Sequence, residues 1–304
     1  MRVFVAGASG AIGEPLIAEL LKQGHSVVGM TTSEKRAKVL ENQGASSIVV
    51  NAFDAEAVAT ALKQSKAEAV IDELTSLPKD QTEMPQYAAG DTKLRIEGGG
   101  NLFRAAIAVG VRRYVQQSSG FFLKAAKGAL ADEDSPLDVN ASPGIAGSAR
   151  MYEALEHRLF QSDAIEGVSL RYGFFYGPKT WYYPGGSAAD MVMRQVTPVI
   201  GDGQGVSSFV HIQDAAIATV AALTADAGVY NVVDDNPSPQ SVWFPAFAKF
   251  LGAPPPPHMT EADARATAGE DAVYYATKLV GASNAKAKRV LGWQPRRLEW
   301  LQAG

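Results

Sequence analysis

The chain has 304 residues, a formal net charge of −4 and no cysteine. This length suits one large α/β unit with an added lobe, and the acidic balance argues against nucleic acid or a membrane surface as a partner. The absence of cysteine excludes disulfides, thiolate zinc sites and a cysteine nucleophile, and the 4 histidines lack a metal-ligand spacing, so no metal site is predicted. The N-terminal residues resemble neither a signal peptide nor a membrane span, so we expect a cytoplasmic protein.

Strand-like and helix-like segments alternate along the first two thirds of the chain. Helical spacing over 15–24 and 33–44 is bounded by good stop signals, with Ser33 as an N-cap and Gly44 just after the second helix. Nearly continuous apolar strands between amphipathic helices are typical of a parallel sheet covered on both faces, an α/β doubly wound Rossmann fold. The predicted strands are 2–7, 25–31, 46–50, 67–74, 112–119 and 167–174.

The sequence changes character after Phe174, where Gly, Pro and aromatic residues become frequent. One more strand is predicted at 228–233. We therefore predict a dinucleotide-binding domain and a smaller substrate-binding lobe, with the ligand between them at the carboxyl ends of the strands. The domain would comprise 1–174 and 206–233, and the lobe 175–205 and 234–304.

A glycine-rich motif, Gly-Ala-Ser-Gly-Ala-Ile-Gly at 7–13, lies between the first predicted strand and the first predicted helix. Gly7 would permit the tight turn, Gly10 would let the backbone approach a pyrophosphate, and Gly13 would let helix and strand pack closely. The alternative is a plain strand–turn–helix built from small residues. We predict that a dinucleotide is bound by Gly7, Ser9, Gly10, Ala11, Ile12 and Gly13.

The G-x-x-G-x-x-G spacing resembles the short-chain dehydrogenase/reductase superfamily. Further segments resemble its extended NAD-dependent epimerase/dehydratase branch, and they occur in the order expected for that branch. They are RYVQQSSG at 113–120, LRYGFFYGP at 170–178, GDGQGVSSFVHIQDAA at 201–216 and SNAKAKRVLGWQP at 283–295. The resemblance implies a Rossmann fold, a nicotinamide cofactor and a small-molecule substrate. The superfamily often dimerises, so a homodimer is a candidate assembly.

The end of the second strand indicates which nicotinamide is preferred. A carboxylate there would bind the adenosine ribose hydroxyls and select NAD, but the resemblance places Thr31 at that position. Thr31 and Thr32 offer hydroxyls, and Lys35 and Arg36 offer positive charge, so we expect NADP(H), with NAD(H) as the alternative cofactor. These four residues could equally be ordinary capping and surface residues. The remaining predicted cofactor contacts are Asn51, Ala52, Phe53, Leu74, Thr75, Gln117, Tyr172 and Phe174.

The superfamily's catalytic tyrosine and lysine, Y-x-x-x-K, are missing from the expected helix. The family's E-A-L run occurs at 153–155, a register that puts Ile145 at the tyrosine position and Ala149 at the lysine position. A shift of three residues puts Ser148 and Tyr152 there instead, and neither register restores the pair. The sequence therefore resembles atypical members of the superfamily that keep the cofactor fold.

Two classes of function remain open. The chain could be an oxidoreductase that draws its proton from Ser119, which matches the superfamily's serine, from Tyr152, from Tyr176 or from water. Its substrate would then need little acid assistance, as an iminium, a quinone-like ring or an activated alkene does. The chain could instead bind the nucleotide without turnover, as a redox sensor or partner-binding protein. A sugar epimerase or dehydratase is disfavoured, because those reactions depend on the missing tyrosine.

We place the catalytic role on Ser119 and Tyr152, although Tyr152 could simply be a buried helix tyrosine. The one Y-x-x-x-K in the chain, Tyr274 to Lys278, lies near the C-terminus and is interpreted as chance. Aromatic residues gather where the cleft is expected, which suits a small, flat, apolar or aromatic substrate. The alternative is that they form core between the lobes. The predicted substrate contacts are Phe121, Phe122, Tyr176 and Trp181.

Overall fold

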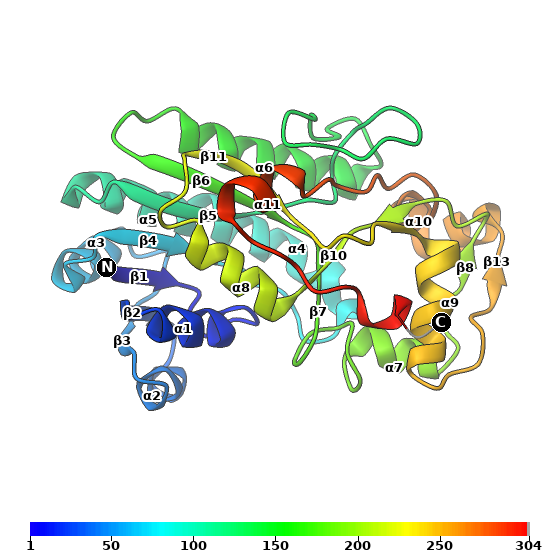
Figure 1. Cartoon of the computed structure of the whole chain (residues 1–304), viewed down its shortest axis with the longest axis horizontal. Helices are drawn as coiled ribbons and strands as arrows, with labels where there is room; N and C mark the ends of the chain where they lie inside the picture. The colour runs from blue at the N-terminus through cyan, green and yellow to red at the C-terminus, as the bar shows by residue number, and fades with distance from the viewer. Residues whose placement is uncertain (303–304) are drawn as a thin grey trace.

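A seven-stranded sheet forms the centre of the molecule (Figure 1), as the computed structural model of residues 1–302 shows. The strand order is β11-β6-β5-β4-β1-β2-β3, and every neighbouring pair is parallel. This is the α/β doubly wound arrangement that the alternating pattern predicts. The strands are β1 (Arg2–Ala6), β2 (Ser26–Thr31), β3 (Ser46–Val49), β4 (Ala69–Asp72), β5 (Arg113–Ser119), β6 (Glu166–Tyr172) and β11 (Gly228–Val232).

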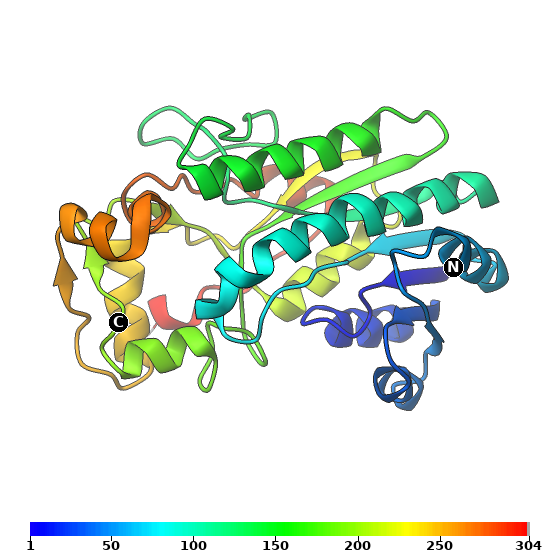
Figure 2. The ribbon, with the colours of Figure 1, turned by 180° about the vertical axis from the view of Figure 1, so that it is seen from behind.

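Helices cover both faces of this sheet (Figures 1 and 2). Successive side chains of a strand point to opposite faces, so Val3 and Val5 enter one apolar cluster with α1 and α8, while Phe4 and Ala6 enter another with α3 and α5. The helices on the first face are α1 (Gly13–Lys22), α2 (Glu34–Asn42), α8 (Ile212–Ala221) and α11 (Ala285–Leu291). Those on the second are α3 (Ala55–Ser65), α4 (Met84–Lys93), the π-helical turn η2 (Leu94–Gly98), α5 (Gly99–Val109) and α6 (Pro143–Phe160).

All seven predicted strands form, with each end within about two residues of its predicted position. The difference with most consequence is at the end of β6, which stops at Tyr172. A Cβ on Gly173 would lie 2.6 Å from the carbonyl oxygen of Ser208. The backbone at Gly173 is therefore in close contact with the backbone at Ser208 where the strand ends. Phe174 therefore begins a separate strand, β7 (Phe174–Tyr176), which pairs with β10 (Phe209–His211).

The ends of α2 form as the sequence predicts. The side chain of Ser33 accepts a hydrogen bond from the main-chain N–H of Arg36, and Gly44 follows the helix with φ +97°. An oxygen side chain at the N-cap and a left-handed glycine after the last turn are the signals that bound a helix.

A smaller lobe lies beyond the carboxyl ends of the strands (Figure 1). Its core packs Phe209, Trp243, Phe247 and Trp300 together. Ala287 and Trp293, by contrast, are buried in the apolar cluster of the large sheet, although the prediction placed 234–304 in the lobe. The remaining elements are η1 (Gln81–Glu83), α7 (Ser187–Met193), β8 (Val199–Ile200), β9 (Val206–Ser207), β12 (Ser238–Pro239), α9 (Gln240–Phe250), β13 (His258–Met259), α10 (Glu261–Thr277) and η3 (Glu299–Leu301).

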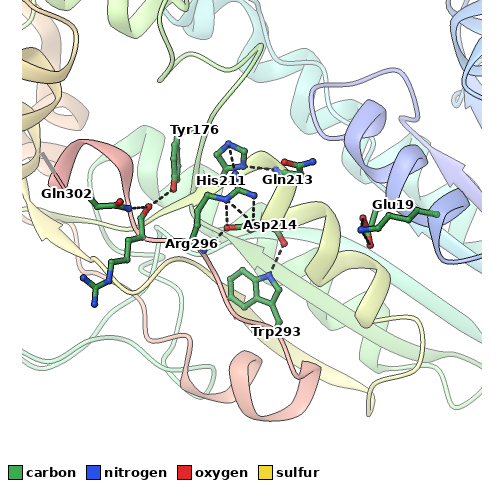
Figure 3. A network of polar contacts seen from close by, with 10 residues as sticks. Glu19, Tyr176, His211, Gln213, Asp214, Trp293, Arg296 and Gln302 are labelled. Carbon is green, nitrogen blue, oxygen red and sulfur yellow. Dashed lines mark hydrogen bonds and ion pairs between the residues drawn. The ribbon is translucent and has the colours of Figure 1, made fainter.

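A polar network fastens the C-terminal segment to the start of α8 (Figure 3). The Asp214 carboxylate accepts from the Arg296 guanidinium at 2.9 Å, and its main-chain oxygen accepts from the Trp293 indole at 2.9 Å. The ring of His211 accepts from the N–H of Gln213 at 3.2 Å and so caps the helix. Burial lowers the pKa of His211 to about 4, which keeps the ring neutral.

The residues described include no helix long and apolar enough for a membrane span.

A buried carboxylate fixes α6 against two strands. Glu156 accepts hydrogen bonds from Ser118 on β5 at 2.9 Å and from Ser169 on β6 at 3.0 Å. It also forms an ion pair with Arg171 at 2.7 Å, and both charged side chains are almost completely buried. Breaking such a pair leaves an uncompensated buried charge, which costs about 3–5 kcal/mol. This cost holds α6 in one position on the sheet.

A second buried acid, Glu73, lies just beyond β4 and is 3% exposed. The Tyr172 hydroxyl donates to its Oε1 at 2.9 Å, while its Oε2 has no partner among the residues described. Burial raises the pKa of Glu73 to about 8, against a smaller opposing effect of the Tyr172 hydrogen bond. The folded protein therefore holds a proton on Glu73 at neutral pH.

This proton makes stability depend on pH. Between the ordinary pKa of 4.5 and about 8, the folded chain binds one more proton than the unfolded chain, so the free energy of unfolding falls as pH rises. Glu73→Gln removes this loss. From pH 4 to pH 8, the variant should gain about a few kcal/mol relative to the unmodified protein. Urea unfolding at several pH values measures the difference, and Glu153→Gln on an exposed position is the control. A difference that does not change with pH would contradict the assignment.

Candidate cofactor and substrate site

The glycine loop after β1 has the geometry that its sequence predicts. Gly7 adopts φ +78°, and a Cβ there would lie 2.3 Å from the carbonyl oxygen of Glu73. A Cβ on Gly13 would lie 2.0 Å from the carbonyl oxygen of Ala8. Neither position has room for any other residue. Because Gly10 donates its N–H to Gly7 at 2.8 Å, the loop closes as a tight turn.

The loop leads directly into α1 and fits a pyrophosphate. Gly10 and Ala11 are exposed, and Ile12 at the helix N-cap supplies no side-chain hydrogen bond to the first turn. The first N–H groups of a helix need partners and carry the positive end of its dipole, so they are well suited to phosphate. Ser9, also in this loop, is half-buried.

The end of β2 carries hydroxyls and positive charge, as predicted. Thr31 is buried, and its hydroxyl lies 3.1 Å from that of Ser9. Arg36 donates to the Thr32 hydroxyl at 3.3 Å. Lys35 and Arg36 are exposed, and within residues 1–302 neither forms an ion pair. The last residue of the strand, Thr31, is therefore not a carboxylate, and the first turn of α2 adds the exposed cations Lys35 and Arg36 next to the exposed Glu34.

The other predicted cofactor residues follow or end neighbouring strands. Phe53 is exposed after β3, with the Lys93 ammonium 5.3 Å from its ring centre, and Ala52 is buried with its carbonyl bonded to Asn101. Gln117 lies in β5, and its Oε1 is buried without a partner among the residues described. Their cofactor contacts stay predictions, as do those of Asn51, Leu74 and Thr75.

The structure contradicts two predicted roles. Tyr172 is 2% exposed, and its hydroxyl is bonded to Glu73 and, at 2.6 Å, to Thr219, so its side chain lies between the sheet and α8 and cannot reach a cofactor. Tyr176 is fully buried and donates to the carbonyl of Arg297 at 3.3 Å (Figure 3). Its side chain belongs to the core of the lobe, so it can neither contact a substrate nor supply a proton.

The two serines at the end of β5 have different surroundings. Ser118 belongs to the Glu156 network, whereas Ser119 faces the other way, as alternate residues of a strand do. Ser119 is 2% exposed, and its hydroxyl accepts a long hydrogen bond, 3.5 Å, from the N–H of Phe121. Ser119 is thus the serine whose hydroxyl retains the capacity to bond elsewhere.

In the register set by the E-A-L run at 153–155, apolar side chains occupy the positions of the catalytic pair on α6, whereas the register shifted by three residues puts Ser148 and Tyr152 there. Ile145 is 2% exposed and Ala149 is 0% exposed, and both lie in one apolar cluster with Tyr152. The Tyr152 ring packs 5.9 Å from Phe122, and the Arg95 guanidinium lies 5.4 Å from its centre. Burial raises the pKa of the Tyr152 hydroxyl, and Arg95 partly opposes this. Within residues 1–302 this hydroxyl makes no hydrogen bond.

Beside these positions lies a group of rings that we call the aromatic cluster: Phe121, Phe122, Tyr152, Phe174, Tyr182 and Tyr275. Phe121 and Phe174 are stacked at 4.3 Å with 10° between their planes. Tyr182 and Tyr275 pack 5.9 and 6.1 Å from Phe174. Of the predicted residues, Phe121, Phe122 and Phe174 come together here. Trp181 lies outside the cluster and donates to the carbonyl of Pro78 at 3.2 Å.

Tyr275 was not predicted. It follows Tyr274, the first residue of the one Y-x-x-x-K in the sequence. The Tyr274 hydroxyl donates to Asp138 at 2.9 Å, outside the aromatic cluster. The only sequence signal for Tyr275 is its place beside another tyrosine on α10.

In the part of the chain that the structure describes, His, Asp and Glu side chains form no group of three that could hold a metal.

Comparisons with known proteins agree with this geometry. Residues 3–233 match the model of the NAD dependent epimerase/dehydratase family. Over 302 residues the chain is 39% identical to a 3-diazoavenalumate denitrifying reductase from a Streptomyces species, covering 99% of this chain and 98% of that protein.

Solved structures show the same fold. The UDP-glucose 4-epimerase of Thermus thermophilus, solved in complex with NAD, is 25% identical with a TM-score of 0.73, covering 97% of this chain and 94% of that one. The UDP-glucose 4-epimerase of Thermotoga maritima is 20% identical with a TM-score of 0.75, covering 99% and 95%. The chain therefore belongs to the NAD dependent epimerase/dehydratase family and is an NAD(P)-dependent oxidoreductase.

Proposed function

We propose that this protein reduces a small aromatic compound with NADPH and without a proton from a tyrosine–lysine pair. The observation that carries the proposal is the pair of buried apolar side chains, Ile145 and Ala149, at the positions that the register of the E-A-L run at 153–155 gives to that pair. Neither side chain can donate a proton or hold a charge. A substrate whose reduction needs no acid fits such a site, because general acid catalysis requires a titratable group within hydrogen-bond reach.

A diazo-substituted aromatic ring is the substrate class that we propose. The 39% identical relative is named as a reductase that denitrifies a diazo compound. For an arenediazonium ion, hydride from NADPH bonds to the ring carbon while the carbon–nitrogen bond breaks. Its electron pair leaves with N2, so Ar–N2⁺ and NADPH give Ar–H, N2 and NADP⁺. The balance contains no proton, which agrees with the loss of the catalytic pair.

The residues present can serve this reaction in distinct ways. The loop from Gly7 to Gly13 would hold the pyrophosphate, and Arg36 with Thr31 would bind the adenosine ribose and its 2′-phosphate. The aromatic cluster offers flat apolar surface for a ring, which stacks favourably on other rings. Ser119 would orient the substrate. When bound, NADPH supplies the hydride.

Cofactor preference depends on Arg36 in this proposal. Arg36→Ala should weaken NADPH binding about tenfold, because a charge-assisted bond to the 2′-phosphate is lost, and should leave NADH binding nearly unchanged. Thr31→Asp should likewise weaken NADPH more than NADH, by repulsion. Fluorescence titration of both nucleotides measures the effect. Lys38→Ala, two residues along α2 and on another face, is the matched control. Equal losses for both nucleotides would count against the assignment.

Hydride transfer itself is tested with a simple arenediazonium salt and NADPH labelled with deuterium at the transferred position. We expect one N2 and one ring-deuterated arene for each NADPH oxidised, above blanks that contain no protein or heat-denatured protein. NADPH binding without arene formation above the blanks would defeat the proposed reaction. That outcome would favour a protein that binds the nucleotide without turnover.

The role of Tyr152 follows from the same balance. Because the reaction consumes no proton, Tyr152→Phe should keep kcat for the diazonium substrate within about threefold. A loss of about a hundredfold is the size expected for removal of a general acid, and it would assign the proton to Tyr152. Single-turnover rates measured by stopped flow give the comparison, with Tyr274→Phe as the control on a tyrosine outside the aromatic cluster.

A further inference from the structure

Three tyrosines from separate parts of the chain meet at the aromatic cluster. Tyr152 comes from α6, Tyr182 from the segment after β7, and Tyr275 from α10. Tyr152 packs against Phe122, and the other two pack against Phe174. Phe122 and Phe174 both pack on Phe121. The three phenol rings are therefore connected through these phenylalanines and share one apolar environment.

The hydroxyls of these three tyrosines, of which Tyr152 is buried and Tyr182 and Tyr275 are partly buried, differ from those of the remaining buried tyrosines. Within residues 1–302, the hydroxyls of Tyr152, Tyr182 and Tyr275 make no hydrogen bond, yet none is among the completely enclosed atoms that lack a partner. Five other buried tyrosines each donate their hydroxyl to a named acceptor: Tyr114, Tyr172, Tyr176, Tyr230 and Tyr274. The three hydroxyls are therefore not enclosed by protein, and each can donate to a ligand at the aromatic cluster.

These hydroxyls are donors and poor acids. Burial raises the pKa of Tyr182 to about 12. Burial also raises the pKa of Tyr275, with smaller contributions from Tyr182, Asp271 and Tyr152. The Arg95 guanidinium lies 5.4 Å from the centre of the Tyr152 ring, and its charge is balanced by a buried ion pair with Asp91 at 2.7 Å. Neutral hydroxyl donors favour an oxygen acceptor that carries partial or full negative charge.

We propose that Tyr152, Tyr182 and Tyr275 form a subsite for an oxygen substituent on the aromatic substrate, a ring hydroxyl or a carboxylate. The phenylalanines would cover the apolar part of the ring, and the three hydroxyls would donate to the oxygen. The subsite rests on the proposed function only in treating the aromatic cluster as the substrate site. It sets which aromatic compounds bind and how they are turned, and it moves no proton.

Binding of unreactive probes to the whole chain, with NADP⁺ present, tests the subsite by calorimetry. Phenol and benzoate should each bind at least about tenfold more tightly than toluene, which has the ring and no oxygen. Tyr182→Phe and Tyr275→Phe should each reduce this preference about three- to tenfold, the effect of one lost hydrogen bond, and should leave toluene unchanged. Tyr183→Phe and Tyr274→Phe, the adjacent tyrosines, are the matched controls. The two oxygen-bearing probes also separate a hydroxyl from a carboxylate as the preferred group.

Several outcomes would overturn the subsite: equal affinity for all three probes, no binding of either oxygen-bearing probe, or equal losses in the control variants. Each variant keeps its ring, and each must still bind NADPH, which shows that it is folded. If Tyr182→Phe or Tyr275→Phe fails to fold, the other of these two variants and Tyr152→Phe, with the same expected effect, carry the test. The binding experiment measures no turnover, so it is independent of the test of the diazo reaction. Preference for the oxygen-bearing probes without arene formation would retain the subsite and reject the diazo reaction. Arene formation without that preference would retain the reaction and reject the subsite.

Discussion

The buried Glu156 carboxylate is the interaction on which the site depends. It receives hydrogen bonds from Ser118 on β5 and from Ser169 and Arg171 on β6, so it ties one helix to two strands. Because it allows α6 only one rotation about its axis, the face that continues from Glu156 must also point inward. Four, seven and eleven residues back along the helix, that face presents Tyr152, Ala149 and Ile145. A buried polar network thus decides which side chains of α6 face the aromatic cluster.

The same constraint explains why the loss of the catalytic pair leaves the fold intact. Lysine and tyrosine at positions 149 and 145 would bring a charge and a hydroxyl into an apolar cluster, where each would need a partner. Alanine and isoleucine need none and pack directly. The phenol hydroxyls nearby stay protonated near neutral pH, since burial raises the pKa of both Tyr152 and Tyr182.

The parts predictable from sequence are those encoded by neighbouring residues. The strands, the glycine turn at Gly7 and the Ser33 cap depend on local conformation and apolar runs, and the structure contains them all. Tyr172 and Tyr176 were misjudged, because a sequence does not show which side of a strand meets a helix or a second strand. Tyr275 was missed for the same reason. Its partners lie far away along the chain, and only tertiary packing brings them together.

The residues of the aromatic cluster are synthesised at different times. Its rings come from five places in the chain, and the last of them, Tyr275, follows the others at a long distance along the sequence. The glycine loop and its surrounding strands consist of much earlier residues and can pair while the ribosome is still working, since domains fold as the chain emerges. The half of the site that we propose for the nucleotide can therefore form before the half that we propose for the substrate.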